Sequence, residues 1–484
     1  MQAFGCKNFR KFQNLPMMDL GGINIFVGTN NSGKSSFTRG LMLFAQNLDI
    51  KDWMDVFLPP FKVFNFINLG GERLHLGSYN TCINEENADG EMAFSIINGN
   101  TTISVILAKP YEIPALSVPI KSIEITNKEV GAKLLYNIDE QKTNGGTVKM
   151  EIDIPQALSY SNETRTKFFD MLMLKRNPKE KVESVIKRCD NIINILQNYK
   201  QKYFCIEECF HHTFHHTKQD SIESAIKDYI YSYIPNCIIK DLNHPVIHYV
   251  EAHMATHDSW INVEDKNNYL ARTVVQYKNI SDEKKVSNKI FYDQVHGFLL
   301  KHMRELDVCD NFRIFFHNAE FFSIDVNDGE HTKDLSAKGT GSIQMFILLL
   351  RIACALLSCE EKKMILIVEE PEMNMHPKMQ SLLADLFYEA FNLSKGNLQF
   401  VVETHSEYLV RKMQVITSKE INHKGRFLKD MNSLIKVYFF PMDSIPYSME
   451  LKSNGHFVNT FGTGFFDEAG KSYMDLTKIA NGLL

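Results

Sequence analysis

The chain has 484 residues, 44% of them hydrophobic and 23% charged, so it is too long for one ordinary hydrophobic core and too apolar for a disordered protein. Its 53 Lys and Arg residues against 58 Asp and Glu residues give a net charge of −5, which argues against a surface dominated by nucleic-acid-binding charge. The 9 cysteines contain no CxxC pair and do not indicate a disulfide framework. The most apolar run, Ile343–Leu357, is interrupted by Arg351 and is shorter than the ~20 residues that span a bilayer. We expect a soluble, cytoplasmic protein that makes no membrane contact.

The first part of the chain, residues 1–155, predicts a strand, a helix and then a β-rich lobe. The short apolar run Ile23–Val27 is typical of a buried strand. The helix that follows repeats apolar residues at a spacing of 3.6, namely Phe37, Leu41, Phe44 and Leu48. Further strands are predicted at 104–107, 122–125 and 148–152, with turns at Asn98-Gly99 and Gly145-Gly146.

Residues 156–244 differ from the β-rich part before them, because their charged amphipathic patterns predict a helical insertion. The run His211–His216 pairs histidines four residues apart, which could bind Zn²⁺ on a helix. No acidic or cysteine ligand at an obvious spacing completes such a site, so a polar surface is the favoured interpretation. Residues 245–440 alternate strands and helices like a layered α/β domain, and 441–484 form a short C-terminal domain.

The first motif, from Gly28 to Ser35, matches G-x-x-x-x-G-K-[ST] between a strand and a helix. Its glycines let backbone N–H groups approach phosphates, and the helix N-terminus adds partial positive charge. We expect Lys34 to neutralise the β- and γ-phosphates of ATP and Ser35 to hold Mg²⁺ through its hydroxyl. The alternative is a Gly- and Asn-rich turn with a surface lysine. The residues expected to bind nucleotide are Gly28, Asn30, Asn31, Ser32, Gly33, Lys34, Ser35 and Ser36.

The second motif is an apolar run, Met364–Val368, that ends in Glu369 and Glu370. Such a strand places carboxylates at the carboxyl edge of a parallel sheet, beside the phosphate loop. We expect Glu369 to orient Mg²⁺ and Glu370 to polarise the attacking water, with the two side chains on opposite faces of the strand. The alternative is an acidic strand end that faces solvent.

The third motif is another apolar run, Gln399–Glu403, followed by Thr404 and His405. The helix before it is predicted to begin at His376-Pro377 and to bury Leu382, Leu386 and Phe391. A histidine at the end of this strand can contact the γ-phosphate and sense its loss, so we expect His405 to be catalytic together with Glu370 and Lys34. The alternative is a histidine with a structural role only.

The fourth motif, Asp334–Gln344, holds Ser336, Gly339 and Gly341 in front of an apolar helix. This arrangement predicts a second anion-binding helix terminus. Because one subunit needs only one phosphate cradle, we expect these three residues to close over nucleotide bound to another copy of the chain. The alternative is a helix N-cap with a Gly-rich lead-in.

These four motifs in this order resemble the ABC-type ATPases of the SMC, RecF and OLD group, which bind ATP between two head domains. The resemblance covers residues 1–155 and 245–440 and is strongest to bacterial AAA-family ATPases with the form EEPExxxHP, here Glu369–Pro377. It implies an α/β fold: an ABC-type P-loop ATPase head with a β-rich lobe and a helical insertion. The run Gly455–Glu468 resembles the short C-terminal domain of unknown function in one branch of these ATPases.

The sequence departs from the group's pattern at two motifs. Glu369 stands where the metal aspartate is usual, and LSAKGTGSIQ stands where LSGGQ is usual. The glutamine of the group's Q-loop has no clear counterpart, although Leu76–Asn80 lies where it is expected.

The resemblance implies a Mg²⁺-dependent ATPase that dimerises head to head on ATP and switches a partner effector, a nuclease or toxin encoded nearby, in bacterial anti-phage defence. An alternative is a RecF-like repair ATPase that acts directly on DNA, and a third possibility is a scaffold that binds ATP and turns it over very slowly. We expect no nuclease activity in this chain, because the residues after His405 contain no DxD with an upstream catalytic glutamate.

Overall fold

The computed structural model describes residues 1–47, 66–70, 76–87, 90–110, 116–138, 146–152, 203–205, 246–250 and 256–480, the last range without 266, 318–319, 330, 361 and 463–465, together with single positions between 181 and 241. The chain divides into two compact units, each built from separate stretches of sequence. The first unit consists of Met1–Asp19 and Arg39–His244, and the second of Leu20–Thr38 and Pro245–Leu484. The predicted domains 1–155, 156–244, 245–440 and 441–484 stay predictions.

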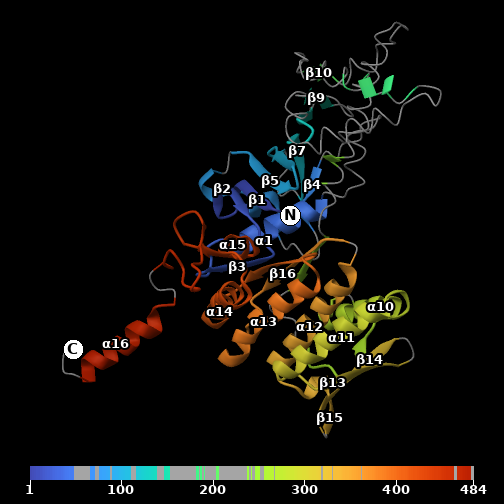
Figure 1. Ribbon diagram of the computed structural model, residues 1–484, viewed down its shortest axis with the longest axis vertical. Helices are drawn as coiled ribbons and strands as arrows, with labels where there is room; N and C mark the ends of the chain where they lie inside the picture. The colour runs from blue at the N-terminus through green and yellow to red at the C-terminus, as the bar shows by residue number, and fades with distance from the viewer. Residues whose placement is uncertain are drawn as a thin grey trace. The chain divides into compact units, whose positions relative to one another are not determined.

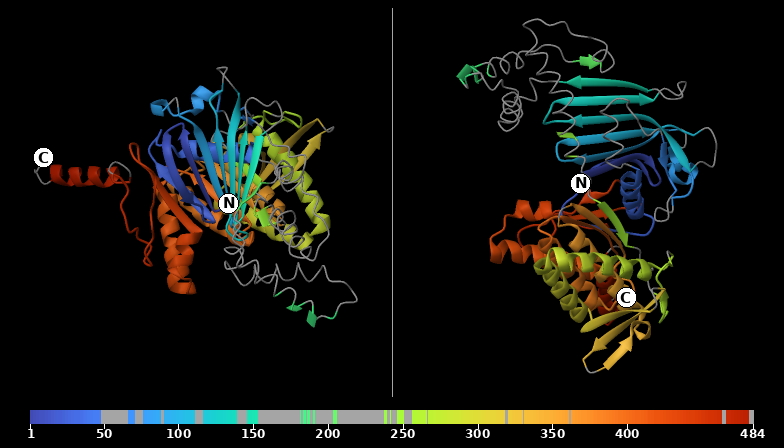
Figure 2. Two further views of the ribbon diagram at one scale, coloured as in Figure 1. Left: turned by 90° about the horizontal axis from the view of Figure 1, so that it is seen from above. Right: turned by 90° about the vertical axis from the view of Figure 1, so that its right-hand side faces the viewer.

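The first unit contains a nine-stranded antiparallel sheet in the order β10-β9-β8-β7-β6-β5-β1-β2, with β4 paired to β7 (Figure 2). Buried and half-buried side chains alternate along β6, as expected for a strand with one face in the core. Gly99 has a φ of 60° and forms the turn between β5 and β6. The elements are β1 (Ala3–Phe9), β2 (Phe12–Asp19), β4 (Phe66–Asn68), α3 (Tyr79–Cys82), η1 (Glu85–Asn87), β5 (Met92–Asn98), β6 (Thr101–Leu107), β7 (Ser117–Asn127), β8 (Ala132–Ile138), β9 (Gly146–Ile152) and β10 (Tyr203–Cys205).

The second unit is built on a sheet in the order β11-β16-β17-β3-β18-β19. Its first five strands are parallel, and only β19 is antiparallel to its neighbour. Every residue of β3 is buried, which is typical of a parallel strand covered on both faces. Strand β17 lies between β3 and β16, so one strand separates the P-loop strand from the acidic strand. The strands are β3 (Ile23–Gly28), β11 (Val246–Val250), β16 (Met364–Glu369), β17 (Leu398–Glu403), β18 (Ile435–Phe440) and β19 (Tyr447–Ser448).

The central helix of this unit is α12 (Thr340–Ser358), which is buried from Ile343 to Leu357. Helices α10 (Tyr269–Ser287) and α11 (Lys289–Glu305) pack on it (Figure 1). Its Arg351 has two partners inside the core: Nη1 donates to the Gln276 side chain at 2.6 Å, and the guanidinium lies 4.6 Å from the centre of the Tyr269 ring. Within the described ranges α12 is the one helix long and apolar enough to cross a membrane, and 83% of that apolar window is buried inside the unit.

Helix α1 (Lys34–Asn47) follows β3, and α13 (Pro377–Leu393) follows the acidic strand and packs against β17, β3 and α14 (Glu407–Lys424). The His376 side chain caps α13 by accepting from the Lys378 N–H, and Pro377 occupies the first helical position. The predicted start of this helix is therefore confirmed. Its predicted core residues also lie inward, because Leu386 is buried and Leu382 and Phe391 pack partly buried against the core.

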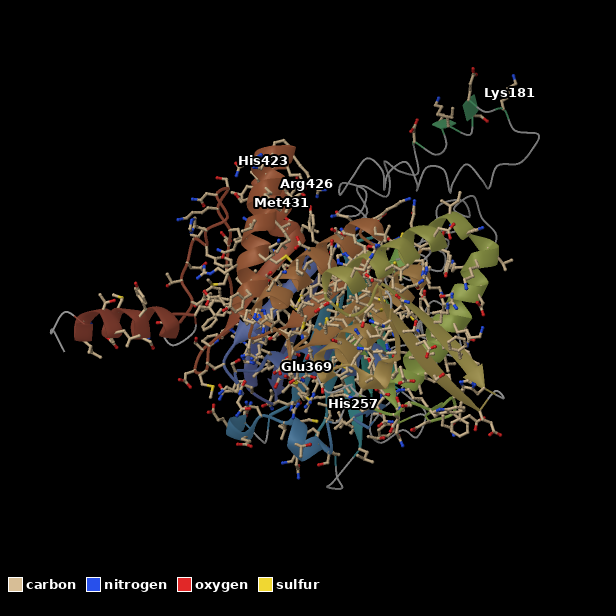
Figure 3. The ribbon with its side chains drawn as sticks, turned by 90° about the horizontal axis from the view of Figure 1, so that it is seen from below. Lys181, His257, Glu369, His423, Arg426 and Met431 are labelled. Atoms are coloured by element: carbon tan, nitrogen blue, oxygen red, sulfur yellow. The ribbon has the colours of Figure 1, made fainter. Side chains whose placement is uncertain are left out.

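The remaining elements of the second unit lie at its edges. A small sheet has the order β12-β14-β13, with β15 paired to β14. Helix α14 ends at Gly425, in the left-handed conformation, near His423 and Arg426 (Figure 3). Helix α16 exposes residues 471–479 and extends away from the unit in Figures 1 and 2. The bounds are β12 (Ile261–Asn262), β13 (Asn311–His317), β14 (Phe321–Asp328), β15 (His331–Asp334), η3 (Leu335–Ala337), α15 (Leu428–Leu434) and α16 (Glu468–Ala480).

The predicted α/β class, with a P-loop at the end of a parallel sheet and a separate β-rich lobe, is confirmed. The strands predicted at 23–27, 104–107, 122–125 and 148–152 lie within β3, β6, β7 and β9. Apart from the short strand β10 and single positions, the predicted helical insertion lies outside the described residues. The His211–His216 run, Leu48 and Gly145 lie outside them as well.

Candidate functional site

The P-loop joins β3 to α1 through backbone conformations that glycine adopts most easily. Gly28 has a φ of 154° and Gly33 a φ of 106°. A side chain on Gly28 would also collide with the carbonyl oxygen of Phe440 on β18. Between the glycines, Asn31 adopts a left-handed φ of 60°, which asparagine tolerates better than most residues. The sequence G-x-x-x-x-G therefore matches the backbone that the loop requires.

Lys34 is the first residue of α1 and is held inside the loop. Its Nζ donates to the carbonyl oxygens of Gly28 and Thr29, both at 2.9 Å, and its side chain is only 6% exposed. Burial lowers the pKa of Lys34, while the carboxylates of Glu403, Glu370, Glu372 and Glu369 oppose that shift. The lysine is thus placed at the phosphate loop, within electrostatic reach of four acids.

The next residue of the helix, Ser35, contacts an acid from β17. Its Oγ donates to Glu403 Oε2 at 2.8 Å, and the Thr38 hydroxyl, one turn later, donates to Glu403 Oε1. Glu403 is 2% exposed. Burial raises the pKa of Glu403 to about 7, and the neighbouring Glu369 adds to this effect.

Glu369 is the last residue of β16 and stands directly opposite Glu403 in the parallel ladder. Residues in register on neighbouring strands face the same side of a sheet, so the two carboxylates adjoin (Glu369 is labelled in Figure 3). The hydroxyl of Tyr249, on β11, donates to Glu369 Oε2. Tyr249 is fixed in turn, because its carbonyl oxygen accepts from the Tyr269 hydroxyl at 2.5 Å.

Glu370 lies beyond the strand, because β16 ends at Glu369. The expectation that Glu369 and Glu370 lie on opposite faces of one strand is therefore wrong, because Glu370 is not part of the strand. Glu370 has a left-handed φ of 42°, a conformation that costs free energy for a residue with a side chain. A hydrogen bond from its N–H to the Glu403 carbonyl oxygen, at 2.8 Å, holds this turn. The turn, and not the strand, sets the direction of the Glu370 side chain.

His405 meets Glu370 at this edge of the sheet, since its Nε2 lies 3.7 Å from Glu370 Oε1. Burial lowers the pKa of His405 to about 4, and the Lys34 cation contributes to the shift. The imidazole is thus neutral at pH 7. A fourth acid, Glu372, fixes the histidine backbone: it is 9% exposed, and its Oε1 accepts from the His405 N–H at 2.6 Å. Burial raises the pKa of Glu372.

Ser336 belongs to a separate group around the start of α12. It lies in η3, where its N–H donates to the Asp334 side chain at 2.8 Å. Its Oγ lies 2.8 Å from Ser259 Oγ, and its carbonyl oxygen lies 3.1 Å from Nδ1 of His257, the residue labelled in Figure 3. The segment 256–259 of the same chain thus contacts the predicted signature residue.

The two signature glycines have different surroundings. Gly339 is the N-cap residue of α12, and a Cβ added to it would meet nothing within 4 Å. A Cβ on Gly341 would lie 2.5 Å from the carbonyl oxygen of Asn374, four residues after Glu370. The Asn374 amide also donates to the Gln344 side chain at 3.1 Å. The start of α12 is therefore packed tightly against the segment that follows the acidic strand.

The donors at the P-loop fit a nucleotide with its magnesium ion. Ser32 Oγ is buried inside the loop and has no hydrogen-bond partner among the described residues, as expected for a group that a phosphate oxygen would satisfy. Ser35, Glu369 and Glu403 supply hard oxygen atoms, which Mg²⁺ prefers. No group of three or more His, Cys, Asp or Glu side chains in the described part of the chain forms a metal site by itself. That suits an ion that completes its shell with phosphate and water oxygens.

The structure brings Lys34, Ser35, Glu369, Glu370 and His405 to one edge of the sheet. It places the other residues expected to bind nucleotide in or beside the P-loop, namely Gly28, Asn30, Asn31, Ser32, Gly33 and Ser36. Sequence reasoning missed three residues, Glu403, Tyr249 and Glu372. The signal for Glu403 was present, since an acid ends the apolar run Leu398–Glu403 as Glu369 ends Met364–Glu369. Nothing in the sequence pointed to Tyr249.

The signature glycines provide a matched pair for a stability test. We expect Gly341→Ala to lower the free energy of unfolding by about 1–3 kcal/mol, because the new methyl group meets a backbone oxygen that cannot move freely. Gly339→Ala should cost less than about 1 kcal/mol, since only a helix N-cap changes. Urea unfolding followed by circular dichroism measures both values. Equal losses would contradict the tight contact at Asn374.

The low pKa of His405 gives a pH prediction for the nucleotide-free protein. Between the ordinary histidine value near 6.5 and about 4, the unfolded chain binds a proton at this residue that the folded chain does not. This contribution to stability is therefore present above pH 6.5 and is lost as the pH falls towards 4. In ¹³C-histidine NMR spectra, assigned with His405→Gln, the His405 signal should titrate well below pH 6. A midpoint near 6.5 would show that the imidazole is not desolvated.

Comparison with known proteins places this site in a family. A search among curated proteins found no match. Solved structures similar to the chain are an Smc head bound to the C-terminal winged-helix domain of ScpA (11% identity, TM-score 0.38, 93% of this chain and 98% of that one), a Pyrococcus furiosus Smc head with an extended coiled coil bound to the C-terminal domain of ScpA (13%, 0.32, 99% and 99%) and the SMC head of Thermotoga maritima (10%, 0.31, 93% and 100%). The model of the AAA ATPase domain family matches residues 1–410, from the first strand to beyond His405, and the chain belongs to this family.

Proposed function

We propose that this chain is a Mg²⁺-dependent ATPase that closes head to head with a second copy on binding ATP and reopens on hydrolysis. The observation that carries the proposal is the position of Lys34. Its ammonium group lies in the P-loop and interacts electrostatically with Glu403, Glu370, Glu372 and Glu369 at the ends of two neighbouring strands. A phosphate-binding cation beside candidate metal and base carboxylates is the arrangement that phosphoryl transfer to water needs.

In the proposed reaction, the P-loop and Lys34 hold the β- and γ-phosphates of ATP. Water attacks the γ-phosphorus, the bond from that phosphorus to the β,γ-bridging oxygen breaks, and Glu370 accepts the proton that the water loses. ADP and phosphate leave. Ser35 and Glu369 would hold Mg²⁺, which supplies charge neutralisation at the phosphate oxygens. His405, neutral because it is desolvated, can hydrogen-bond a γ-phosphate oxygen or the water without repelling Lys34.

The proposal assigns Ser336, Gly339 and Gly341 to nucleotide bound by the opposite copy. Two features of this region support that role. The space beside Gly339, the N-cap residue of α12, is open, so an anion could approach the backbone there closely. Each chain already has its own phosphate cradle at the P-loop, so a second terminus of this kind is free for a neighbour.

Contacts within the chain offer a route by which hydrolysis could alter the dimer. The segment after Glu370 packs on α12 through Asn374, Gly341 and Gln344. Glu370, which would accept the proton during the reaction, is four residues before Asn374 in the sequence, so it lies close along the chain to this packing contact. Because tight packing transmits displacement, the start of α12, and with it the surface offered to the partner copy, would move with the catalytic segment.

By its resemblance to bacterial ATPases of the EEPExxxHP form, we propose that the switch controls a partner effector, a nuclease or toxin, in anti-phage defence. Co-purification from the native host tests for that partner. Measuring the ATPase rate with DNA and with the purified partner separates this role from direct action on DNA, since a rate that rises with DNA alone favours a RecF-like ATPase.

The catalytic assignment predicts a contrast between two variants. Glu370→Gln keeps the size of the base but not its basicity, so it should bind ATP, slow hydrolysis by about 100-fold or more and accumulate as a closed dimer. Lys34→Ala should lose ATP binding and stay monomeric, because the phosphates lose their cation. Nucleotide binding, phosphate release and sedimentation velocity measure the three properties. Normal hydrolysis by Glu370→Gln would place the base elsewhere.

Action across the dimer predicts complementation between inactive variants. Ser336→Arg and Lys34→Ala should each be inactive alone. Mixed in equal amounts they should recover activity up to about half of the wild-type rate, because each mixed dimer, closed by ATP in its one complete site, has one complete site of two. Mixing Lys34→Ala with Glu370→Gln is the control. Both residues lie on the P-loop side of a site, so each of the two sites in a mixed dimer carries one of the changes and neither is complete. Absence of recovery in the first mixture contradicts the assignment of Ser336 to the opposite site.

A further inference from the structure

Glu403 is a buried acid at the nucleotide site to which the sequence motifs assign no role. It ends β17, is 2% exposed and accepts two hydrogen bonds, both from hydroxyl groups of α1. One of these donors is Ser35, the residue that the P-loop pattern assigns to the metal. A carboxylate this deeply buried is costly unless it is compensated, so its presence needs a reason in the function of the site.

The hydrogen-bond arrangement around Glu403 fixes which way the Ser35 hydroxyl points. A serine hydroxyl has one proton to donate and two lone pairs to offer. Since the proton is donated to Glu403 Oε2, the lone pairs remain available for a cation. Left without this acceptor, a serine in the first turn of a helix can turn its proton to nearby backbone carbonyl groups instead.

Each carboxylate oxygen atom of Glu403 accepts a hydrogen bond from one hydroxyl group. Oε1 is held by Thr38, one helical turn after Ser35, and this second contact fixes the plane of the carboxylate. A glutamine in the same position would present one acceptor oxygen and one NH₂ donor, so it could accept a hydrogen bond from only one of the two hydroxyls. The site therefore requires a carboxylate at this position, and the main chain supplies it from the strand that also delivers His405.

Glu369, the neighbour of Glu403 in the sheet, also supports a role for Glu403 at the metal site. Glu369, the other expected metal residue, is in register with Glu403 on β16, so two acids adjoin on one face. Like charges at this spacing repel, and a divalent cation bound beside them relieves the repulsion. Glu403 thus lies between the two groups, Ser35 and Glu369, that are expected to hold the metal.

We propose that Glu403 is the positioning residue of the magnesium site: it orients the Ser35 hydroxyl for Mg²⁺ and links the P-loop helix to the strand that precedes His405. The inference rests on the proposed function, because it concerns Mg²⁺ bound with ATP. It makes Glu403 necessary for metal-dependent binding of nucleotide and leaves metal-free binding to the P-loop and Lys34.

The test compares nucleotide binding with and without magnesium. A fluorescent ATP analogue is titrated into wild type, Glu403→Ala, Glu403→Gln and Thr38→Val in EDTA and at rising Mg²⁺ concentrations, and thermal melting checks each fold. Loss of a residue that orients a metal ligand typically weakens metal affinity 10- to 100-fold. We expect the half-saturating Mg²⁺ concentration to rise by about that factor in Glu403→Ala and at least about threefold in Glu403→Gln, while affinity in EDTA changes less than about threefold.

Thr38→Val is the matched control, because it removes the contact to Oε1 and keeps the one to Ser35. It should melt at a lower temperature but need less than about three times the wild-type Mg²⁺ concentration. The proposal is overturned if both Glu403 variants keep the wild-type magnesium requirement, or if Thr38→Val loses as much as Glu403→Ala. A wild type that binds no nucleotide would overturn the proposed function as well. A wild type that binds Mg²⁺-ATP but does not hydrolyse it would contradict the ATPase alone.

Discussion

The parallel hydrogen-bond register of three strands sets the position of every group at the candidate site. In the ladder, Glu369 of β16 pairs with Glu403 of β17, and Glu403 pairs with Phe26 of β3. The three strands therefore end at nearly the same level, and the P-loop, the acidic turn and His405 emerge side by side. A shift of one residue in either ladder would turn a carboxylate to the other face of the sheet and separate it from Ser35.

Burial shifts the pKa values of the side chains at this site. Glu403 has a pKa raised to about 7 and His405 one lowered to about 4, in both cases mainly because the charged form is poorly solvated. The pKa of Lys34 is subject to two opposing effects, because burial lowers it and four neighbouring acids raise it. Environments that shift the pKa values of neighbouring groups in different directions are frequent at catalytic sites. Hydroxyl groups from α1, rather than a salt bridge, satisfy the oxygen atoms of Glu403.

The contact between the start of α12 and the segment after Glu370 gives the glycines of the predicted signature two separate roles. Gly341 allows the close approach of the Asn374 carbonyl group, whereas Gly339 leaves the helix terminus open. A short pattern such as GTG does not distinguish a glycine needed for packing from one needed for ligand approach. Only the neighbours of each Cβ position separate the two.

The sequence by itself determined the local elements of this protein. Apolar runs of five or six residues predicted β3, β16 and β17, the G-x-x-x-x-G-K-S pattern predicted the P-loop, and His376-Pro377 predicted the start of α13. These features follow from local periodicity and backbone preference, which neighbouring residues define. The tertiary structure decided what the strand ends bring together: Ser35 with Glu403, 368 positions away, Tyr249 with Glu369, and Ser336 with the His257 segment. Contacts of this kind depend on strand order and register, and a single sequence fixes neither, because every apolar strand can pair with several others.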